Sequence, residues 1–189
     1  MNSHGKLVGR LAAPLALTLA LGLSVSAASP GAAAALAGVH IDNFGKVDDE
    51  YYRGAQPHGR EYAELATLGV KTVIDLTRDG RRDEEGIVEH SGMAFVRIPL
   101  TTSDRPSDVA VTQFLSIVND PARQPVYVHC QGGQHRTGVM TAVYRMTKYG
   151  WTEDRAYDEM KQYKFETLFG HPELRHFVHD FYSKLRVAL

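Results

Sequence analysis

The stretch that decides the fold reads PVYVHCQGGQHRTG and spans residues 125–138. Its first four residues are mostly β-branched or aromatic, which is typical of a buried strand, and the glycines that follow end that strand. Apolar residues then recur at helical spacing from Val139 to Tyr149, and Gly150 ends the segment. The stretch therefore predicts a strand, a tight loop and a helix, with the loop wrapped around the N-terminus of the helix.

Such a loop is a ready site for an anion, because backbone N–H groups at a helix N-terminus lack partners and the helix dipole is positive there. Cys130, the only cysteine of the chain, begins the loop. The amides, the dipole and the cation of Arg136 all favour a thiolate over a thiol at this position. Arg136 also offers a planar fork of donors that fits two oxygens of one anion. Phosphate is the ligand that this arrangement predicts.

The order His129, Cys130, five loop residues, Arg136, Thr137 and Gly138 resembles the signature of cysteine-based phosphatases of the protein tyrosine and dual-specificity superfamily. The sequences YRG at 52–54 and QP at 56–57 resemble the opening of atypical dual-specificity phosphatases of bacteria, fungi and plants. The resemblance covers residues 51–182 and is specific at 129–138. A buried structural cysteine is the alternative, but it leaves Arg136 and the glycines without a role.

The resemblance implies a phosphate monoester hydrolase that works through a phosphocysteine intermediate. Cys130 is then the nucleophile, Arg136 binds the phosphoryl group, and the Thr137 hydroxyl donates to the sulfur, while His129 fixes the loop through hydrogen bonds. No cofactor and no metal ion are required. The histidines at 171, 176 and 179 lack the cysteines and carboxylates of a metal site. The remaining residues expected to bind substrate are Gln131, Gly132, Gly133, Gln134, His135 and Gly138.

Three aspartates are candidates for the general acid. In the superfamily it is an aspartate on a loop some tens of residues before the cysteine, and Asp104 lies 26 positions before Cys130 in a polar segment. Asp108 and Asp79 are alternatives. Helix capping accounts for Asp108 more simply, because the preceding Pro-Ser pair suits the start of a helix. We therefore predict Asp104 as the acid.

Basic residues follow the strand predicted at 70–76. In a parallel sheet the loops at the strand C-termini meet at the ligand crevice, so Arg78 is expected to bind substrate, with Arg81 and Arg82 as weaker candidates. Arg53 is expected to form a structural ion pair.

The whole pattern predicts an α/β protein with a three-layer phosphatase fold. Its mostly parallel sheet of four or five strands would be flanked by helices on both faces. Strands are expected at 70–76, 94–99 and 125–128, with a strand or hairpin within 47–57. Helices are expected at 62–68, 84–90, 109–118, 139–149, 153–163 and 172–185.

The N-terminus predicts export. Two basic residues, Lys6 and Arg10, precede an apolar run from Leu11 to Val25, and the sequence ALA at 35–37 offers a cleavage site. We expect residues 1–37 to be a signal peptide and residues 38–189 to be the phosphatase domain, periplasmic or secreted and without membrane insertion. Residues 38–189 would carry 19 basic and 22 acidic residues, a charge that favours no nucleic-acid partner.

The expected function is hydrolysis of phosphate monoesters, and two alternatives are weighed against it. The expected substrate is a phosphorylated protein or a small phosphate ester. Inositol polyphosphates or pyrophosphates are an alternative, but phosphatases that act on them carry basic residues where this loop has Gly132 and Gln134. A rhodanese-like sulfurtransferase is a second alternative, because it also places a cysteine in an anion-binding loop.

Overall fold

The computed structural model describes residues 1, 34, 36–165 and 170–187. Nearly all of the predicted signal peptide, residues 1–37, lies outside the described residues, so the signal peptide stays a prediction. Within the described part of the chain, no helix is both long and apolar enough to cross a membrane.

A five-stranded sheet forms the centre of the protein, in the order β1-β2-β5-β3-β4. Only β1 is antiparallel to its neighbour, and the other pairs are parallel. This confirms the predicted mostly parallel sheet, and the hairpin expected near residues 47–57 is formed by β1 and β2. The strands are β1 Gly45–Lys46, β2 Tyr51–Gly54, β3 Thr72–Thr77, β4 Ala94–Leu100 and β5 Val126–His129.

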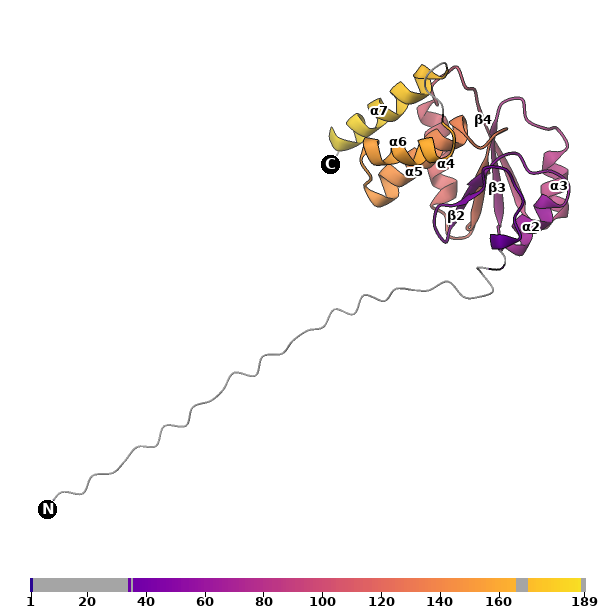
Figure 1. Cartoon of the computed structure of the whole chain (residues 1–189), viewed down its shortest axis with the longest axis horizontal. Coiled ribbons are helices and arrows are strands. Elements are labelled where there is room, and N and C mark those ends of the chain that lie inside the picture. The colour runs from indigo at the N-terminus through magenta and orange to yellow at the C-terminus, as the bar shows by residue number, and fades with distance from the viewer. Residues whose placement is uncertain (2–33, 35, 166–169, 188–189) are drawn as a thin grey trace.

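Helices cover both faces of the sheet, as Figure 1 shows. Side chains that alternate along a strand point to opposite faces, and two apolar clusters result. Ile74 and Val128 belong to the larger cluster with helices α4 to α7, whereas Val73 and Tyr127 belong to the smaller one with α2 and α3. The three-layer α/β fold is therefore confirmed. The helices are α2 Glu61–Thr67, α3 Glu84–His90, α4 Asp108–Val118, α5 His135–Tyr149, α6 Glu153–Gln162 and α7 Pro172–Val187.

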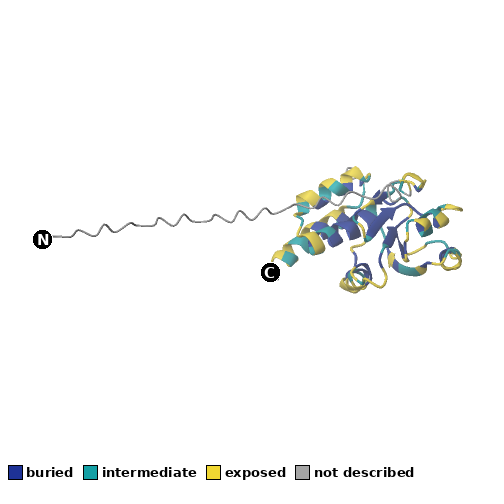
Figure 2. Ribbon diagram, turned by 90° about the horizontal axis from the view of Figure 1, so that it is seen from below, coloured by how far each residue is buried: buried dark blue, intermediate teal, exposed yellow. Residues whose placement is uncertain are grey.

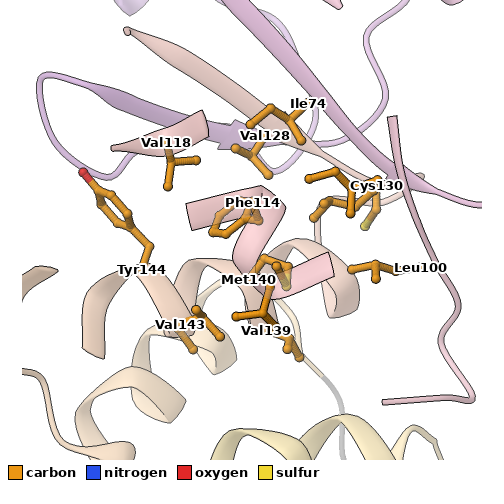
Figure 3. Packing of buried hydrophobic residues seen from close by; sticks show 14 of the residues in the cluster. Ile74, Leu100, Phe114, Val118, Val128, Cys130, Val139, Met140, Val143 and Tyr144 are labelled. Atoms are coloured by element: carbon orange, nitrogen blue, oxygen red, sulfur yellow. The ribbon is translucent and has the colours of Figure 1, made fainter. Parts of the chain in front are cut away.

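The central strands are buried along their whole length, which explains their apolar, β-branched sequences (Figure 2). Cys130 directly follows β5 and belongs to the larger cluster, where Figure 3 shows it among Leu100, Val128 and Met140. The nucleophile candidate is thus held by the core at the end of the most central strand.

Helix α5 begins earlier than predicted. It starts at His135, four residues before Val139, so Arg136 and Thr137 lie in its first turn. The prediction was wrong because Gly133, at φ +64°, already reverses the chain and lets the helix start directly behind the loop. The helix ends as predicted, with Gly150 in the left-handed conformation.

Candidate active site

A polar pocket of about 500 Å³ opens where the chain leaves β3, β4 and β5. It includes seven of the residues predicted to act on substrate, together with Asp79, Leu100, Thr101, Thr102, Ser103 and His171. The seven are Arg78, Cys130, Gln131, Gly132, Gln134, His135 and Arg136. Their convergence follows from the topology, because the loops at the C-terminal ends of parallel strands gather at one edge.

Cys130 and Arg136 are both at the pocket wall, although each is largely buried. Cys130 is 3% exposed and Arg136 is 9% exposed. The Nη1 atom of Arg136 makes one long hydrogen bond to the carbonyl of Leu100, at 3.5 Å, and its Nε has no partner among the described residues. No carboxylate in that part of the chain forms an ion pair with it, so its donors are available to an anion in the pocket.

Gly133 turns the loop between these two residues. At φ +64° it has a conformation that L side chains rarely adopt, and a Cβ atom would overlap the backbone of Gly54. Only glycine lets the loop pack this closely against the end of β2. Gly133 therefore shapes the loop from behind and does not line the pocket.

Two further predicted residues are buried in α5. Thr137 is 0% exposed, and its hydroxyl has no hydrogen-bond partner among the described residues. Its predicted donation to the Cys130 sulfur is therefore not formed here and stays a prediction for a loaded site. Gly138 packs under Met160 and Phe165, so it contributes to helix packing and does not line the pocket.

The predicted acid does not line the pocket. Asp104 is exposed, and its carboxylate accepts hydrogen bonds from Thr101 Oγ1 at 2.7 Å and Ser103 Oγ at 3.3 Å. Asp79 does line the pocket, at the end of β3. Asp108 begins α4 and lines a separate groove, and the cap of that helix is Ser107, whose hydroxyl accepts from the Ala110 N–H.

His135 lies at the pocket wall against a second histidine. Its ring centroid is 4.1 Å from that of His171, whose Nδ1 contacts the Thr102 carbonyl at 2.8 Å. Burial, followed by the charges of His171 and Arg136, lowers the pKa of His135 to about 4. His135 is therefore neutral at pH 7 and adds no positive charge to the site.

A buried polar cluster supports the residue before the nucleophile. His129 is fully buried, with Nε2 at 3.1 Å from Glu84 Oε1 and Nδ1 at 4.0 Å from Asp75. Burial alone would raise the pKa of Glu84, but His129, Gln56 and Tyr62 reverse this effect and lower it. Asp75 is also paired with Arg97, at 2.8 Å.

This cluster is the one set of described residues whose atoms lie close enough to share a metal ion. Asp75 and Glu84 Oε1 accept hydrogen bonds from other side chains, whereas Glu84 Oε2 and both ring nitrogens of His129 have no hydrogen-bond partner among the described residues. The three histidines at 171, 176 and 179 do not converge on one point. His171 contacts Thr102, while the side chains of His176 and His179 pair with separate glutamates.

The prediction for Arg53 was wrong. Arg53 is fully buried and forms no ion pair with any described residue. Its Nη2 instead donates to the carbonyl of Gly133 at 2.8 Å. Sequence reasoning failed because an arginine in a strand usually pairs with a carboxylate when buried, whereas here the partner is a backbone oxygen 80 residues away.

Sequence reasoning also missed residues that the tertiary structure brings to the loop. Glu84 and Asp75 support His129, Asn43 contacts the loop from behind, and His171 closes the pocket wall. Asn43 has a positive φ of +54°, and asparagine is one of the residue types enriched at positive φ, which is the one local signal for it. The other three offer no such signal, because charged and histidine residues are common on helices and strand ends.

Comparison with known proteins agrees with this geometry. A family model described as a DSP-PTPase phosphatase fused to NAD+ kinase matches residues 39–174, which is more than half of the chain. The chain therefore belongs to this family of dual-specificity and tyrosine phosphatases.

Individual relatives are phosphatases as well. The dual specificity protein phosphatase TpbA of Pseudomonas aeruginosa is 32% identical over 121 residues, covering 64% of this chain and 54% of TpbA. The inositol diphosphatase SIW14 of Saccharomyces cerevisiae is 26% identical over 130 residues, covering 66% of this chain and 46% of SIW14. The chain thus spans about half the length of these curated relatives. A crystal structure of a P. aeruginosa TpbA variant with pTyr is 28% identical, with a TM-score of 0.65, and covers 77% of this chain and 89% of that one.

Proposed function

We propose that this chain hydrolyses phosphate monoesters, with Cys130 as the nucleophile. The observation that carries the proposal is that Cys130 and the guanidinium of Arg136, which has no carboxylate partner among the described residues, line one polar pocket at the N-terminus of α5. Family membership and the similarity to TpbA support the same reaction class.

The reaction would run in two displacements. The Cys130 thiolate attacks phosphorus in line with the leaving oxygen, the P–O bond breaks, and a phosphocysteine forms. Arg136 and the loop amides hold the three remaining oxygens, whose charge rises in the transition state. Water then attacks the phosphocysteine, which releases phosphate and restores the thiolate. Thr137 would donate to the sulfur during both steps.

Asp104 is our proposal for the acid. It would protonate the leaving oxygen in the first step and accept a proton from water in the second. Its carboxylate is hydrogen-bonded to Thr101 and Ser103, and Thr101 and Ser103 line the pocket. A rotation of this short turn would therefore bring Asp104 over the phosphoryl group. Asp79 is the competing candidate, because it lines the pocket already.

For the substrate we propose phosphotyrosine or phosphoserine/threonine in a protein, or a small phosphate ester. The pocket wall offers the substrate two arginine cations, Arg78 and Arg136, while His135 is neutral at pH 7. A crowded polyphosphate would leave several anionic groups without a cation in such a site. The similarity to SIW14 keeps an inositol phosphate as the second candidate.

The test is release of phosphate from a phosphotyrosine peptide, a phosphoserine peptide and phytate, measured side by side on residues 38–189. Cys130→Ser serves as the blank, because it removes the thiolate and keeps the size of the side chain. Turnover of either peptide that exceeds turnover of phytate supports the proposal. Equal phosphate release by Cys130→Ser would overturn it, and sulfur transfer from thiosulfate without any phosphate release would favour the sulfurtransferase.

We also propose that the protein is exported and that its substrate lies outside the cytoplasm. The support is the sequence of residues 1–37, with its basic start, apolar run and ALA site. Expression of the full chain with cell fractionation and N-terminal sequencing tests this proposal. A mature N-terminus at Gly38 or nearby in the exported fraction is expected, and an uncleaved protein confined to the cytoplasm would contradict it.

A further inference from the structure

Arg53 lies directly behind the loop that joins Cys130 to the first turn of α5. It is on β2, beside Val128 of β5, and is 0% exposed. Its guanidinium is 3.9 Å from the ring centroid of Tyr163 and donates from Nη2 to the Gly133 carbonyl. Its Nε and Nη1 atoms have no hydrogen-bond partner among the described residues.

Among the residues that the structure describes, no carboxylate forms an ion pair with Arg53. Transfer of a cation from water to the protein interior costs several kcal/mol unless an anion or hydrogen bonds compensate it. Desolvation accordingly lowers the pKa of Arg53, while the nearby Tyr51, Tyr163, Glu159 and Cys130 act in the opposite direction. Of these four groups, Cys130 alone lines the pocket. An anion in the loop would supply the charge that the buried cation lacks.

The backbone contacts of Arg53 also set the direction of the loop amides. In a trans planar peptide the N–H of one residue points opposite to the C=O of the residue before it. The Gly133 oxygen accepts from Arg53 at 2.8 Å and from Asn43 Nδ2 at 2.9 Å, and the Gly132 oxygen accepts from the same Asn43 nitrogen at 3.2 Å. Both carbonyls thus point away from the pocket.

The N–H groups of Gly133 and Gln134 must then point toward the pocket side of the loop. No backbone carbonyl among the described residues outside the helices and strands accepts from either of them. Two donors on the pocket side of the loop, beside the dipole of α5, are what a phosphoryl group needs. Asn43 is itself fixed, because the same Nδ2 reaches the Tyr163 carbonyl at 3.1 Å.

We propose that Arg53 is a positioning residue of the phosphate site. It turns the loop carbonyls backward, together with Asn43, and places a second positive charge behind the thiolate and the bound oxyanion. This proposal rests on the proposed function, since it explains how the same site holds an anion. Arg53 touches neither substrate nor the reacting atoms, so it acts through the loop.

The two contributions are separable by mutation. Arg53→Gln keeps a donor near Gly133 and removes the charge, and Arg53→Lys keeps the charge. Asn43→Ala removes only neutral contacts, to the carbonyls of Gly132, Gly133 and Tyr163. The matched control is Arg145→Gln. Arg145 is also a largely buried arginine, but it pairs with Glu159 at 2.6 Å and contacts the rings of Tyr149 and Trp151, away from the loop.

Two measurements need no turnover. The first is the dissociation constant of orthovanadate, obtained from its protection of Cys130 against iodoacetamide. The second is the pH midpoint of that alkylation, which reports how easily the thiol ionises. We expect Arg53→Gln to weaken orthovanadate about 10- to 50-fold and to raise the midpoint by about one pH unit. Asn43→Ala should weaken orthovanadate about 3- to 10-fold and leave the midpoint unchanged, and Arg53→Lys should restore most of the midpoint shift.

A merely structural role predicts a different result. Arg53→Gln would then lower the melting temperature, as Arg145→Gln should, with no change in either measurement, and that result would overturn the proposal. If Arg53→Gln does not fold, the other two variants test the proposal. Unchanged orthovanadate affinity in Asn43→Ala contradicts it, and so does an alkylation midpoint in Arg53→Lys that is shifted by a full pH unit. Because neither readout uses turnover, a wild-type protein that releases no phosphate would overturn the proposed function alone.

Discussion

The two loops that carry the proposed chemistry are built in opposite ways. The loop at 130–134 is held from behind by side chains distant in sequence, among them Arg53 and Asn43. The turn at 101–104 is held by its own hydroxyls, with Thr101 and Ser103 bonded to the Asp104 carboxylate. Cys130 and Arg136 are buried, whereas Asp104 is exposed.

The contrast indicates which part of the site is fixed in advance. Anion binding needs donors at set positions before the substrate arrives, and burial among core residues provides them. Proton transfer to a leaving group needs a carboxyl that approaches only after the substrate has entered, and an exposed turn permits that movement. We therefore infer that the loop is the rigid part of the site and that the turn is its movable part.

The largest effect is expected at Arg136, in the first turn of α5 directly after the rigid loop. Arg136→Lys keeps the charge but loses the planar fork, so we expect kcat/KM to fall on the order of 10³-fold, with similar weakening of orthovanadate. Arg78→Lys, at the pocket wall but outside the loop, is the matched control and should change kcat/KM less than 10-fold. Steady-state kinetics on a phosphotyrosine peptide provide the measurement, and equal effects of the two variants would contradict the special role of Arg136.

The movable turn should give a smaller effect that depends on the leaving group. Asp104→Asn is expected to lower kcat about 10²-fold on an alkyl phosphate and much less on p-nitrophenyl phosphate, whose leaving group needs no proton. It should also flatten the limb of the pH profile that falls as the acid ionises. Asp79→Asn is the matched comparison. A leaving-group-dependent loss in Asp79→Asn but not in Asp104→Asn would reassign the acid to Asp79.

A third test compares two adjacent glycines of the rigid loop. Gly133→Ala introduces a Cβ atom against the Gly54 backbone at a positive φ, so we expect about 3 kcal/mol of lost stability. Gly132→Ala is the control, since its new Cβ would meet only the flexible Gln134 side chain at 3.4 Å, and it should cost less than about 1 kcal/mol. Urea unfolding measures both values, and equal losses would mean that the close approach to β2 is not what holds the loop.

The smallest effect is expected for the pH dependence of stability that arises from His135 at the pocket wall. The pKa of His135 is about 4 in the folded protein, against an ordinary value of 6.5, so the unfolded chain binds more protons between these pH values. Stability from this group is fully present above pH 6.5 and is lost as the pH falls toward 4. After allowance for partial exposure, the wild type should lose about 2 kcal/mol more than His135→Asn between pH 7 and pH 4. Parallel stability curves for the two proteins would contradict this assignment.

The sequence allowed correct prediction of the elements that depend on local pattern. Runs of β-branched and aromatic residues predicted the buried strands, helical periodicity predicted the helices, and Gly150 marked the end of α5. The start of α5 was missed, because the length of the Gly-rich loop depends on how closely Gly133 approaches β2.

The candidate site likewise contains residues that the sequence predicted and residues that it did not. Seven predicted residues do line the pocket. A cysteine and an arginine separated by five residues lie on the same side of one helix N-terminus, and Arg78 joins them because it follows a neighbouring parallel strand. The partners of the loop were missed or misassigned. Arg53 was assigned an ion pair, and the contacts of Glu84 to His129 and of Asn43 to the loop were not foreseen.

What the sequence by itself determined is the strand, loop and helix with its thiol and guanidinium, since short-range backbone geometry is enough to bring them together. Only the tertiary structure decided what stands behind that loop and that Asp104 stays outside the pocket while Asp79 lines it. Asn43 reaches Gly133 across 90 positions and Arg53 across 80, and such contacts arise from the order of strands in the sheet. No local pattern encodes which strand will lie beside which, because that choice is made by the packing of the whole core.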